Sequence, residues 1–467
     1  MRPIHREKGE DGVVGGERRD LGGLTRHVSN RWLLFAAGEL VAIGFLLAPD
    51  ARAHLAPYLL LFAAGAAVSL WAATILTASR PPRAGFVVFA AALLRATLLF
   101  RAPDLSDDVW RYLWDGRVAS NGVSPYAFAP DDPAVSGYAP RLHEHVAHRD
   151  VRSVYPPAAQ AAFRVFGGAG SVLLWKAFAA GADVCVVALL AAGPGPGAGF
   201  AAALYAFHPL PVTESAGQGH LDSIGVALLL ACLAHLSHRR RGVAGLAFAL
   251  SVLAKYVSLA AVIPLVRRGR FKFLAAAALS GSVIWLAAAQ QGPSPLGGLA
   301  QYATRWSFNS PLYAGLVGAV DSVRLPQRAK DAFLELKDLL HHPGWASRVF
   351  PYFYSAFFAR MLLAVLLAGT LIVIGWRVRL LESAVFASLA ALLLFSPTLY
   401  PWYLLWILPF AAKRRDPAFL FLSFSIPLSY ALLDPMPGLS RGVIQACEYL
   451  PFALLLLVAR LRSEAPP

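Results

Sequence analysis

Apolar residues in this chain gather in long blocks that are separated by short polar segments. Many blocks run for roughly 15–25 residues, about the length at which an α-helix crosses the ~30 Å hydrocarbon core of a bilayer. The predicted segments lie approximately at 31–49, 55–77, 84–100, 171–192, 199–213, 222–237, 243–254, 256–266, 271–289, 352–375, 382–396, 402–412, 417–433 and 445–460. This pattern predicts an all-α polytopic membrane protein with about 12–14 transmembrane or half-membrane helices.

Two neighbouring segments, 243–254 and 256–266, are each too short to cross a bilayer alone. They predict either two half-helices that meet near Lys255 or one long bent helix. Broken helices are tolerated at membrane depth where they line a cavity within the protein.

Composition and charge agree with a membrane protein. The chain is 57% hydrophobic and 15% charged, its mean hydropathy is +0.55, and its net charge is +15. The basic residues form short clusters between apolar blocks, which indicates contact with lipid headgroups rather than with nucleic acid. The three cysteines, Cys185, Cys232 and Cys447, have no metal-ligand spacing. We expect no structural disulfide, no bound metal and no cofactor.

The basic clusters also predict an orientation, because cytoplasmic loops carry an excess of Lys and Arg. If the polar tail 1–30 is cytoplasmic, every cluster that flanks a predicted span falls on the cytoplasmic side. These clusters are Arg80 with Arg83, His238 to Arg241, Arg267 to Lys272, Arg377 with Arg379, Lys413 to Arg415, and Arg460 with Arg462. Within an integral domain 31–462, two long loops then lie outside, 101–170 and 290–351.

The first outer loop is rich in acids and contains a predicted helix. Ser106 is a good N-cap, and Asp107 and Asp108 would then lie in the first turn. Asp108, Arg111 and Asp115 recur at i, i+3 and i+7, and therefore share one helix face at the membrane surface. The alternative is that the aspartates only offset the helix dipole.

Further ionisable groups stand at the junctions between apolar segments. Glu214, His220 and Asp222 lie in a Pro- and Gly-rich turn after His208, between two predicted spans. Lys255 is alone between apolar segments and needs an anion, either a ligand phosphate or one of the carboxylates Glu214 and Asp222. An ordinary hydrated loop is the alternative for the turn.

Aromatic residues mark the remaining outer junctions. They are Tyr155, Trp306 beside Arg305, and Tyr400, Trp402 and Tyr403. Interfacial Trp and Tyr are common membrane anchors, which is the alternative to a binding role. In the second outer loop, Pro326 to His342 has apolar residues at helical spacing and predicts a helix on the membrane surface. No phosphate-cradling loop, zinc-protease or hydrolase motif is present in the sequence.

Taken in order, these motifs resemble a known family. Asp107-Asp108-Val-Trp-Arg-Tyr-Leu-Trp-Asp115-Gly-Arg, Asn121-Gly-Val-Ser-Pro-Tyr126 and Tyr155-Pro-Pro resemble the first outer loop of bacterial polyprenyl-phosphate-mannose-dependent mannosyltransferases of the GT-C fold, similar to glycosyltransferase family 87. Glu214, Gly-His220-Leu-Asp222, Lys255-Tyr256 and Tyr400-Pro-Trp402-Tyr403 fit the same pattern, so the resemblance covers roughly residues 85–410. His208-Pro stands where Asn-Pro is more usual, which leaves the role of His208 open.

The resemblance implies an inverting hexosyltransferase, specifically a mannosyltransferase, in the bacterial inner (cytoplasmic) membrane with an extracytoplasmic site. The donor would be a polyprenyl-phosphate sugar and the acceptor a hydroxyl of an envelope glycan or glycolipid. An aspartate of the first outer loop serves as base in such enzymes, which here implies Asp108 or Asp107. Arg111, His220, Lys255 and Arg305 are candidates to hold the leaving phosphate.

Two other functions remain open at this level. One is a transporter or flippase of lipid-linked glycans, which would use the same intramembrane charges, although no inverted repeat supports it. The other is an envelope polymerase or ligase with a lipid-pyrophosphate donor.

Overall fold

The computed structural model describes residues 21–78, 84–194, 197–290, 292–340, 348–434 and 438–464. The first half of the chain forms α1 (Leu21–Leu47), α2 (Leu55–Ala78), α3 (Ala84–Leu98), α4 (Asp108–Ser120), η1 (Ser136–Tyr138), α5 (Pro140–His143), α6 (Pro157–Ala162), η2 (Phe163–Gly167), α7 (Val172–Ala191), α8 (Gly197–Phe207), α9 (Pro209–Pro211), η3 (Val212–Gly217), α10 (Asp222–Ser237), α11 (Arg241–Ala254), η4 (Tyr256–Ala261) and α12 (Val262–Ala289). The second half forms α13 (Leu296–Arg305), α14 (Pro311–Ser322), α15 (Leu325–Leu340), η5 (Phe350–Tyr352), α17 (Ser355–Arg377), α18 (Leu381–Phe395), η6 (Pro401–Trp406), α19 (Leu408–Arg414), α20 (Pro417–Ser425), η7 (Ile426–Leu432) and α21 (Arg441–Glu464).

The prediction of an all-α polytopic membrane protein is confirmed for the described residues. Six helical stretches are long and apolar enough to cross a membrane, and a seventh results if Pro209–Gly217 and Asp222–Ser237, bent by 118°, count as one span. Five shorter apolar helices accompany them. Large apolar side chains are exposed on the outside of the bundle, among them Leu47 at 77% and Trp376 at 74%, as expected of a surface that faces lipid.

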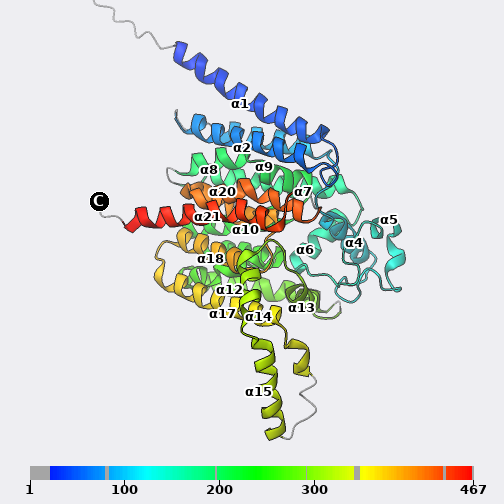
Figure 1. Cartoon of the computed structure of the whole chain (residues 1–467). Coiled ribbons are helices and arrows are strands. Elements are labelled where there is room, and N and C mark those ends of the chain that lie inside the picture. The colour runs from blue at the N-terminus through cyan, green and yellow to red at the C-terminus, as the bar shows by residue number, and fades with distance from the viewer. Residues whose placement is uncertain are drawn as a thin grey trace, which may run out of the picture.

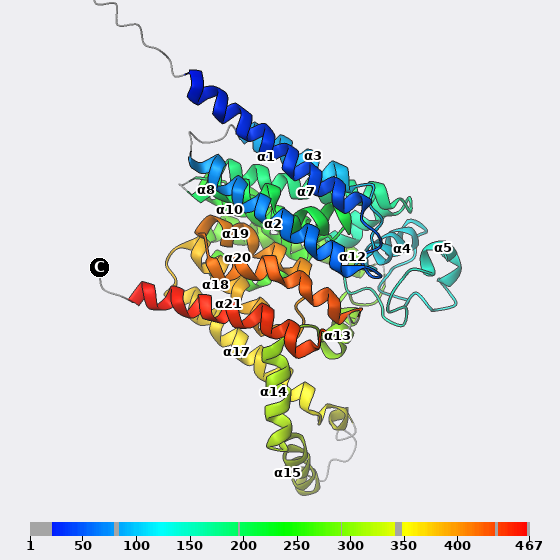
Figure 2. The same cartoon turned by 45° about the horizontal axis from the view of Figure 1, so that its top comes forward.

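The long helices lie side by side in one bundle, and the first outer loop gathers at one end of it (Figure 1). We call this end, which carries α4, α5 and α6, the α4 end. Helices α14 and α15 project sideways from the bundle, across the direction of the spanning helices, in both views (Figures 1 and 2). The predicted helix at Pro326 to His342 is confirmed as α15, although residues 341–347 lie outside the described residues. Its place on a membrane surface stays a prediction.

The break near Lys255 is confirmed, as two half-helices rather than one bent helix. Helix α11 ends at Ala254, Lys255 is extended with φ −156° and ψ 132°, and a 3-10 helix follows. A second break lies within α12 at Arg270, where φ is 60° and ψ is 177°. A Cβ at Gly245 would come within 2.4 Å of the backbone oxygen of Phe273, so glycine allows α11 and the later part of α12 to pack closely.

The basic clusters lie at the opposite end of the bundle from α4. Arg241, Arg268, Lys413 and Arg414 converge on one cavity there, whereas Lys255 is at the other end of α11. We call this the basic end. Arg80 and Arg83 fall in 79–83, outside the described residues. Three of the five described clusters therefore share one end of the bundle, as the orientation argument requires.

Several element boundaries differ from the sequence-based expectation, and prolines account for most of them. Helix α1 begins at Leu21, within the predicted tail 1–30, while residues 1–20 lie outside the described residues. The predicted span 199–213 ends as an α-helix at Phe207, because Pro209 and Pro211 follow. The predicted spans 402–412 and 417–433 are each part 3-10 helix and part α-helix.

Candidate active site

The sequence predicted a helix with Ser106 as N-cap and both Asp107 and Asp108 in its first turn. In the structure, helix α4 begins one residue later, at Asp108. Asp107 stands at the N-cap position, and the Ser106 hydroxyl accepts from the Asp108 N–H at 3.2 Å. Asp107 instead turns outward and pairs with Arg52 of the α1–α2 loop, at 2.7 Å. The structure therefore separates the two aspartates by their partners rather than by exposure: 37% of each side chain is accessible, but Asp107 pairs with Arg52 and Asp108 lies beside His220.

The loop that leads into α4 is held by its own polar side chains and by two from elsewhere in the chain, Gln218 and Lys176. Gln218 donates to Asp104 at 3.0 Å and accepts from the Leu105 N–H at 2.9 Å. Asp104 also pairs with Arg101. The ammonium of the fully buried Lys176 on α7 donates to the carbonyls of Leu98 and Leu99 at 3.1 and 3.0 Å. These contacts fix the loop between α3 and α4, and therefore the position of Asp108.

Asp115, predicted on the same face as Asp108, is fully buried and accepts hydrogen bonds from three side chains. It accepts from Arg111 Nε at 2.8 Å, from the Ser153 hydroxyl at 2.6 Å and from Gln160 Nε2 at 2.7 Å. Its carboxylate thus ties α4 to the 153–160 segment. Tyr155 is positioned by this segment and packs edge-to-face on Tyr112, with ring centroids 5.0 Å apart.

One guanidinium nitrogen of Arg111 makes no hydrogen bond to any described residue. Its Nε is bonded to Asp115, but its Nη2 is buried and has no hydrogen-bond partner among the described residues. A buried guanidinium nitrogen without a partner is costly unless a ligand satisfies it. Arg111 therefore remains a candidate for binding an anionic or hydroxyl group of a substrate.

Asp108 faces a buried histidine and a second carboxylate. Nδ1 of His220 lies 3.7 Å from Asp108 Oδ2, and Nε2 of the same ring lies 3.4 Å from Glu214 Oε2. Glu214 in turn accepts from the Tyr430 hydroxyl at 2.7 Å. His220 and Glu214 are both fully buried, whereas 37% of the Asp108 side chain is accessible. Asp108 is thus the solvent-facing member of an Asp–His–Glu row.

Lys255 and Asp222 form the second charged pair of the site. Lys255 Nζ lies 2.6 Å from Asp222 Oδ1, which also accepts from Trp406 Nε1 at 2.6 Å. The same ammonium lies 4.5 Å from the centroid of the Tyr403 ring. Of the two carboxylates weighed from the sequence, Asp222 is therefore the partner of Lys255. Since 18% of the Lys255 side chain remains accessible, its ammonium can also contact a ligand anion.

The aromatic residues form a continuous stack against this charged cluster. The rings of Phe308, Tyr400, Trp402 and His220 follow one another at centroid distances of 4.3, 4.5 and 4.0 Å. Beside the stack, the Tyr403 hydroxyl lies 2.6 Å from that of Tyr302, which stacks on Trp306 at 5.3 Å. The Tyr400–Tyr403 segment and Trp306 are therefore brought to the site, and they contribute to its walls.

Arg305 lies apart from this cluster. It pairs with Asp150 at 2.7 Å, and both side chains are more than half exposed. This pair joins the two long loops at the rim of the α4 end. His208 is also remote from the row: it caps the short helix α9 and lies 3.0 Å from the Ser423 hydroxyl, so its role in this structure is to join α9 to α20.

The environment of Asp108 shifts its titration. Desolvation by the surrounding protein raises the pKa of Asp108 to about 6, the ammonium of Lys255 opposes this rise, and the carboxylates of Asp222 and Asp107 add to it. A carboxylate with such a pKa is largely ionised at neutral pH and is still a stronger base than an ordinary aspartate, which suits general base catalysis.

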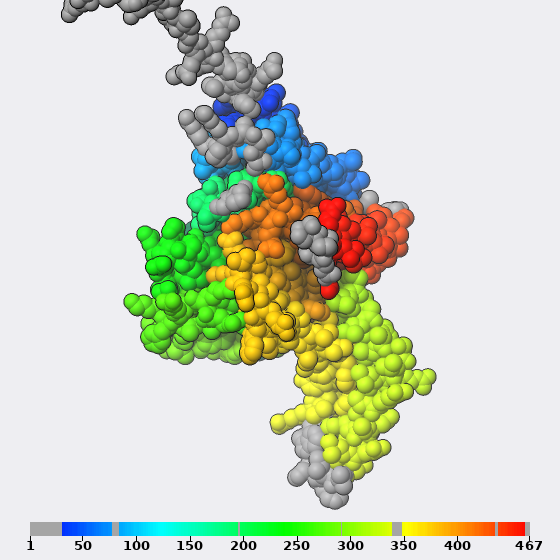
Figure 3. Space-filling model, turned by 90° about the vertical axis from the view of Figure 1, so that its left-hand side faces the viewer, coloured from blue at the N-terminus to red at the C-terminus, as the bar shows by residue number. Residues whose placement is uncertain are grey.

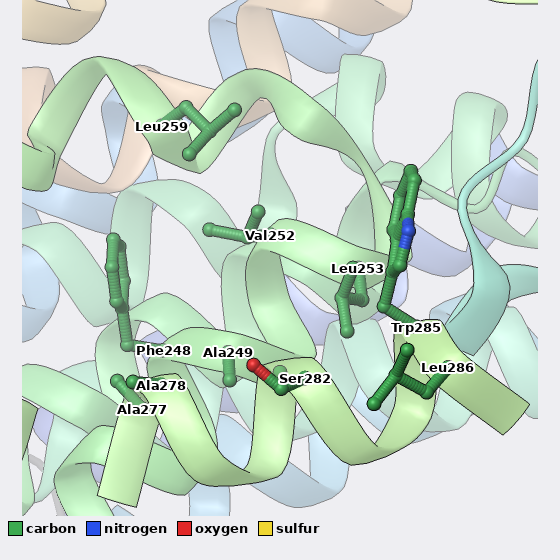
Figure 4. A pocket seen from close by; sticks show the side chains of 11 residues that line it. Phe248, Ala249, Val252, Leu253, Leu259, Ala277, Ala278, Ser282, Trp285 and Leu286 are labelled. Carbon is green, nitrogen blue, oxygen red and sulfur yellow. The ribbon is translucent and has the colours of Figure 1, made fainter. Parts of the chain in front are cut away.

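An apolar groove runs along the bundle toward Lys255. It has a volume of about 510 Å³ and lies between α11, η4 and α12. Phe248 and Ala277 mark one end, and Leu253 and Trp285 lie toward the other (Figure 4). Leu253 precedes Lys255 by two residues, so this end of the groove lies toward the Lys255 end of α11.

Sequence reasoning missed several residues that the fold brings to this site. Lys176, Gln218, Tyr302 and Phe308 hold the loop before α4 or extend the aromatic walls. Only Lys176 carried a usable signal, because an ionisable residue within an apolar block usually has a specific partner. The other three are ordinary loop residues in the sequence.

The fold is that of a membrane-embedded glycosyltransferase of the GT-C class, as the match to a family model shows. That model describes the N-terminal domain of alpha-(1→6)-mannopyranosyltransferases of the MptA/B family and matches residues 34–268, half of the chain. The chain belongs to this family and is therefore an enzyme, which confirms the resemblance found in the sequence. The matched range contains the three residues of the Asp–His–Glu row and Lys255, but not the Tyr400–Tyr403 segment. No curated protein and no solved structure matches the chain.

Proposed function

We propose that this enzyme transfers mannose from a polyprenyl-phosphate donor to a hydroxyl of an envelope glycan or glycolipid, with inversion, at the extracytoplasmic face of the bacterial inner membrane. The observation that carries the proposal is one accessible carboxylate, Asp108, within electrostatic reach of the Lys255–Asp222 pair, together with an apolar groove that extends toward the Lys255 end of α11. A donor with a charged head and a long apolar tail fits such a site. Both chain termini would then be cytoplasmic, with the basic end facing the cytosol.

The chemistry needs a base but no strong acid. Asp108 accepts the proton of the acceptor hydroxyl while the hydroxyl oxygen attacks C1 of the mannose. The bond between C1 and the phosphate oxygen breaks, and the electron pair leaves with polyprenyl phosphate. Because phosphate already has a low pKa, electrostatic stabilisation by Lys255 is sufficient for its departure, and the unpaired Arg111 Nη2 is a second donor. Inversion to an α-linked product requires a β-linked donor.

His220 and Glu214 act in this scheme as positioning residues. Both ring nitrogens of His220 are buried, and neither has a hydrogen-bond partner in the described part of the chain. Small movements that shorten the 3.7 and 3.4 Å separations would align Asp108, His220 and Glu214. The stack of Trp402 and Tyr400 on His220 holds the imidazole ring in place.

The test of the proposed function is transfer by the purified enzyme. We expect radiolabelled mannose to move from β-linked polyprenyl phosphomannose to an α-mannoside acceptor and to form an α-(1→6) bond. The α-linked donor isomer and a nucleotide-linked mannose are the matched negative controls. Transfer from the nucleotide sugar alone would refute the lipid-linked donor.

The pKa of Asp108 predicts an acid limb in the pH profile. Below pH about 6 the carboxyl is protonated and cannot accept a proton, so kcat/KM should fall about tenfold for each pH unit. Because the Asp107 carboxylate raises the pKa of Asp108, Asp107→Asn should move this limb to lower pH. Initial rates measured with donor and acceptor both well below KM across pH 4.5–8 test both statements. A limb that moves upward in Asp107→Asn would contradict the assignment.

The groove predicts that chain length of the donor matters. A Cβ at Gly281 would make only an ordinary contact with Ala249, at 3.9 Å, so Gly281→Phe should fill the groove without a clash with the backbone. We expect KM for a long-chain donor to rise about tenfold, while KM for a short-chain analogue changes little. Gly369→Phe is the matched control, since a Cβ at Gly369 on α17 meets no atom within 4 Å. Equal effects on both donors would exclude the groove as the tail site.

A further inference from the structure

A second cavity lies at the basic end, remote from the candidate active site. It has a volume of about 480 Å³, within the range of small-molecule sites, and lies among the ends of α10, α11, α12, α18 and α19. Figure 3 looks onto this face, where the green ends of α10 to α12 lie beside the yellow and orange ends of α17 to α19. The proposed reaction does not use this cavity.

The charges around the cavity are unbalanced. Arg241, Arg268, Lys413 and Arg414 line it, and Glu382 is the one acidic group in the lining. Glu382 pairs with Lys413 at 2.7 Å, and Arg414 donates to the Ser383 hydroxyl at 2.7 Å. Among the described residues, Arg241 and Arg268 have no ion-pair partner. The cavity therefore carries three uncompensated positive charges and attracts an anion.

Apart from Ser237 and Ser383, the rest of the lining is apolar. Leu233 and Leu236 of α10 and Phe410 of α19 form the part of the cavity that lies deeper in the bundle. Leu380 and Leu381, at the start of α18, complete the apolar wall. A free inorganic anion would gain nothing from these side chains, whereas an anionic amphiphile would contact the cations with its phosphate and the leucines with its upper methylene groups.

We propose that this cavity binds the headgroup of an anionic glycerophospholipid from the leaflet at the basic end. The bound phosphate offsets the repulsion among Arg241, Arg268 and Arg414, and so joins the ends of α10, α11, α12 and α19. The opposite ends of α10 and α11 carry Asp222 and Lys255 of the active site. Binding of the lipid thus stabilises the two helices that position the charged pair. The proposal does not depend on the identity of the sugar donor.

Lipid binding to the purified full-length enzyme tests this proposal. Native mass spectrometry of the protein, titrated with phosphatidylglycerol or phosphatidylcholine of the same acyl chains, gives the affinity for each lipid. We expect preferential binding of phosphatidylglycerol that weakens roughly thirtyfold in Arg241→Gln/Arg268→Gln, at about one kcal/mol for each cation. The charge-matched control is Arg377→Gln/Arg462→Gln, two exposed arginines at the ends of α17 and α21 that do not line the cavity.

The outcomes distinguish a specific lipid site from a general surface-charge effect and from a site for a free anion. Equal weakening in both double variants would show a general surface-charge effect and overturn the site. Equal affinity of the wild-type protein for the two lipids would overturn it as well. Displacement of phosphatidylglycerol by an equal concentration of inorganic phosphate would reveal a free-anion site rather than a lipid site. If the double variant does not fold, the single exposed Arg268→Gln should still weaken binding roughly fivefold, and an unchanged affinity would refute the proposal.

Discussion

Asp108→Asn is expected to lower kcat for mannosyl transfer by about 10²–10⁴-fold, the usual contribution of a general base. The amide keeps the shape of the carboxyl but cannot accept the proton of the acceptor hydroxyl. The variant should fold normally, because Asp108 is 37% accessible and makes only a 3.4 Å contact with the Tyr112 hydroxyl and a 3.7 Å approach to His220. Transfer rates and a thermal unfolding curve of the purified variant measure the two effects separately.

Asp107→Asn is the matched control for that experiment. Asp107 has the same side chain one residue earlier, but it is engaged in an exposed pair with Arg52, which is worth at most about 1 kcal/mol. We expect Asp107→Asn to retain most of the transfer activity at neutral pH. If both variants kept near wild-type rates, neither aspartate would be the base. If only Asp107→Asn lost activity, the roles assigned here would be reversed.

Lys255→Met is the second substitution with a large expected effect. Removal of the ammonium takes away the cation nearest to the proposed leaving phosphate, and we expect kcat to fall about 10²–10³-fold, as for loss of one preorganised electrostatic group. The acid limb of the pH profile should also move upward, because Lys255 holds the pKa of Asp108 down. Asp222→Asn should move the limb downward, because the Asp222 carboxylate raises that pKa.

A purely structural role of Lys255 gives a different result. Lys255→Met leaves the buried Asp222 carboxylate without its counter-ion, which destabilises the protein by about 3–5 kcal/mol if the charge stays buried. The double variant Lys255→Met/Asp222→Asn removes both charges and should recover stability. We expect it to remain inactive, whereas Lys255→Arg should retain activity in part. Recovery of transfer in the double variant would mean that Lys255 serves only to neutralise Asp222.

The sequence located the charged residues of the site but not their contacts. Lys255 and Asp222 stood out because ionisable groups at membrane depth are costly and need partners. The pairing of Lys255 with Asp222 rather than with Glu214 depends on how α10 and α11 pack, and on Trp406, which donates to the same carboxylate. Likewise, the sequence left Asp107 and Asp108 as alternatives for the base, and the tertiary contacts distinguish them: Arg52 of the distant α1–α2 loop pairs with Asp107, whereas His220 lies beside Asp108.

For some residues the sequence predicted a place near the substrate but gave no information on their contacts. Asp115 and Arg305 were expected near the substrate, yet Asp115 is buried with three donors and Arg305 is at the rim with Asp150. Helix periodicity gives the face on which a side chain lies, but not which loop covers that face. Tyr400 and Trp402 were ambiguous between membrane anchors and site walls, and their stack with His220 places them in the walls.

By itself the sequence determined the class of fold, the helical breaks and the membrane environment. These properties follow from local physics: blocks of apolar residues must be helical in lipid, and a lysine or a Pro-Gly turn interrupts such a block. Only the tertiary structure decided which carboxylate is accessible, which cation opposes it, and which cavity carries unbalanced charge. Those outcomes depend on segments far apart in the chain, whose approach is set by packing of the whole bundle rather than by any local pattern.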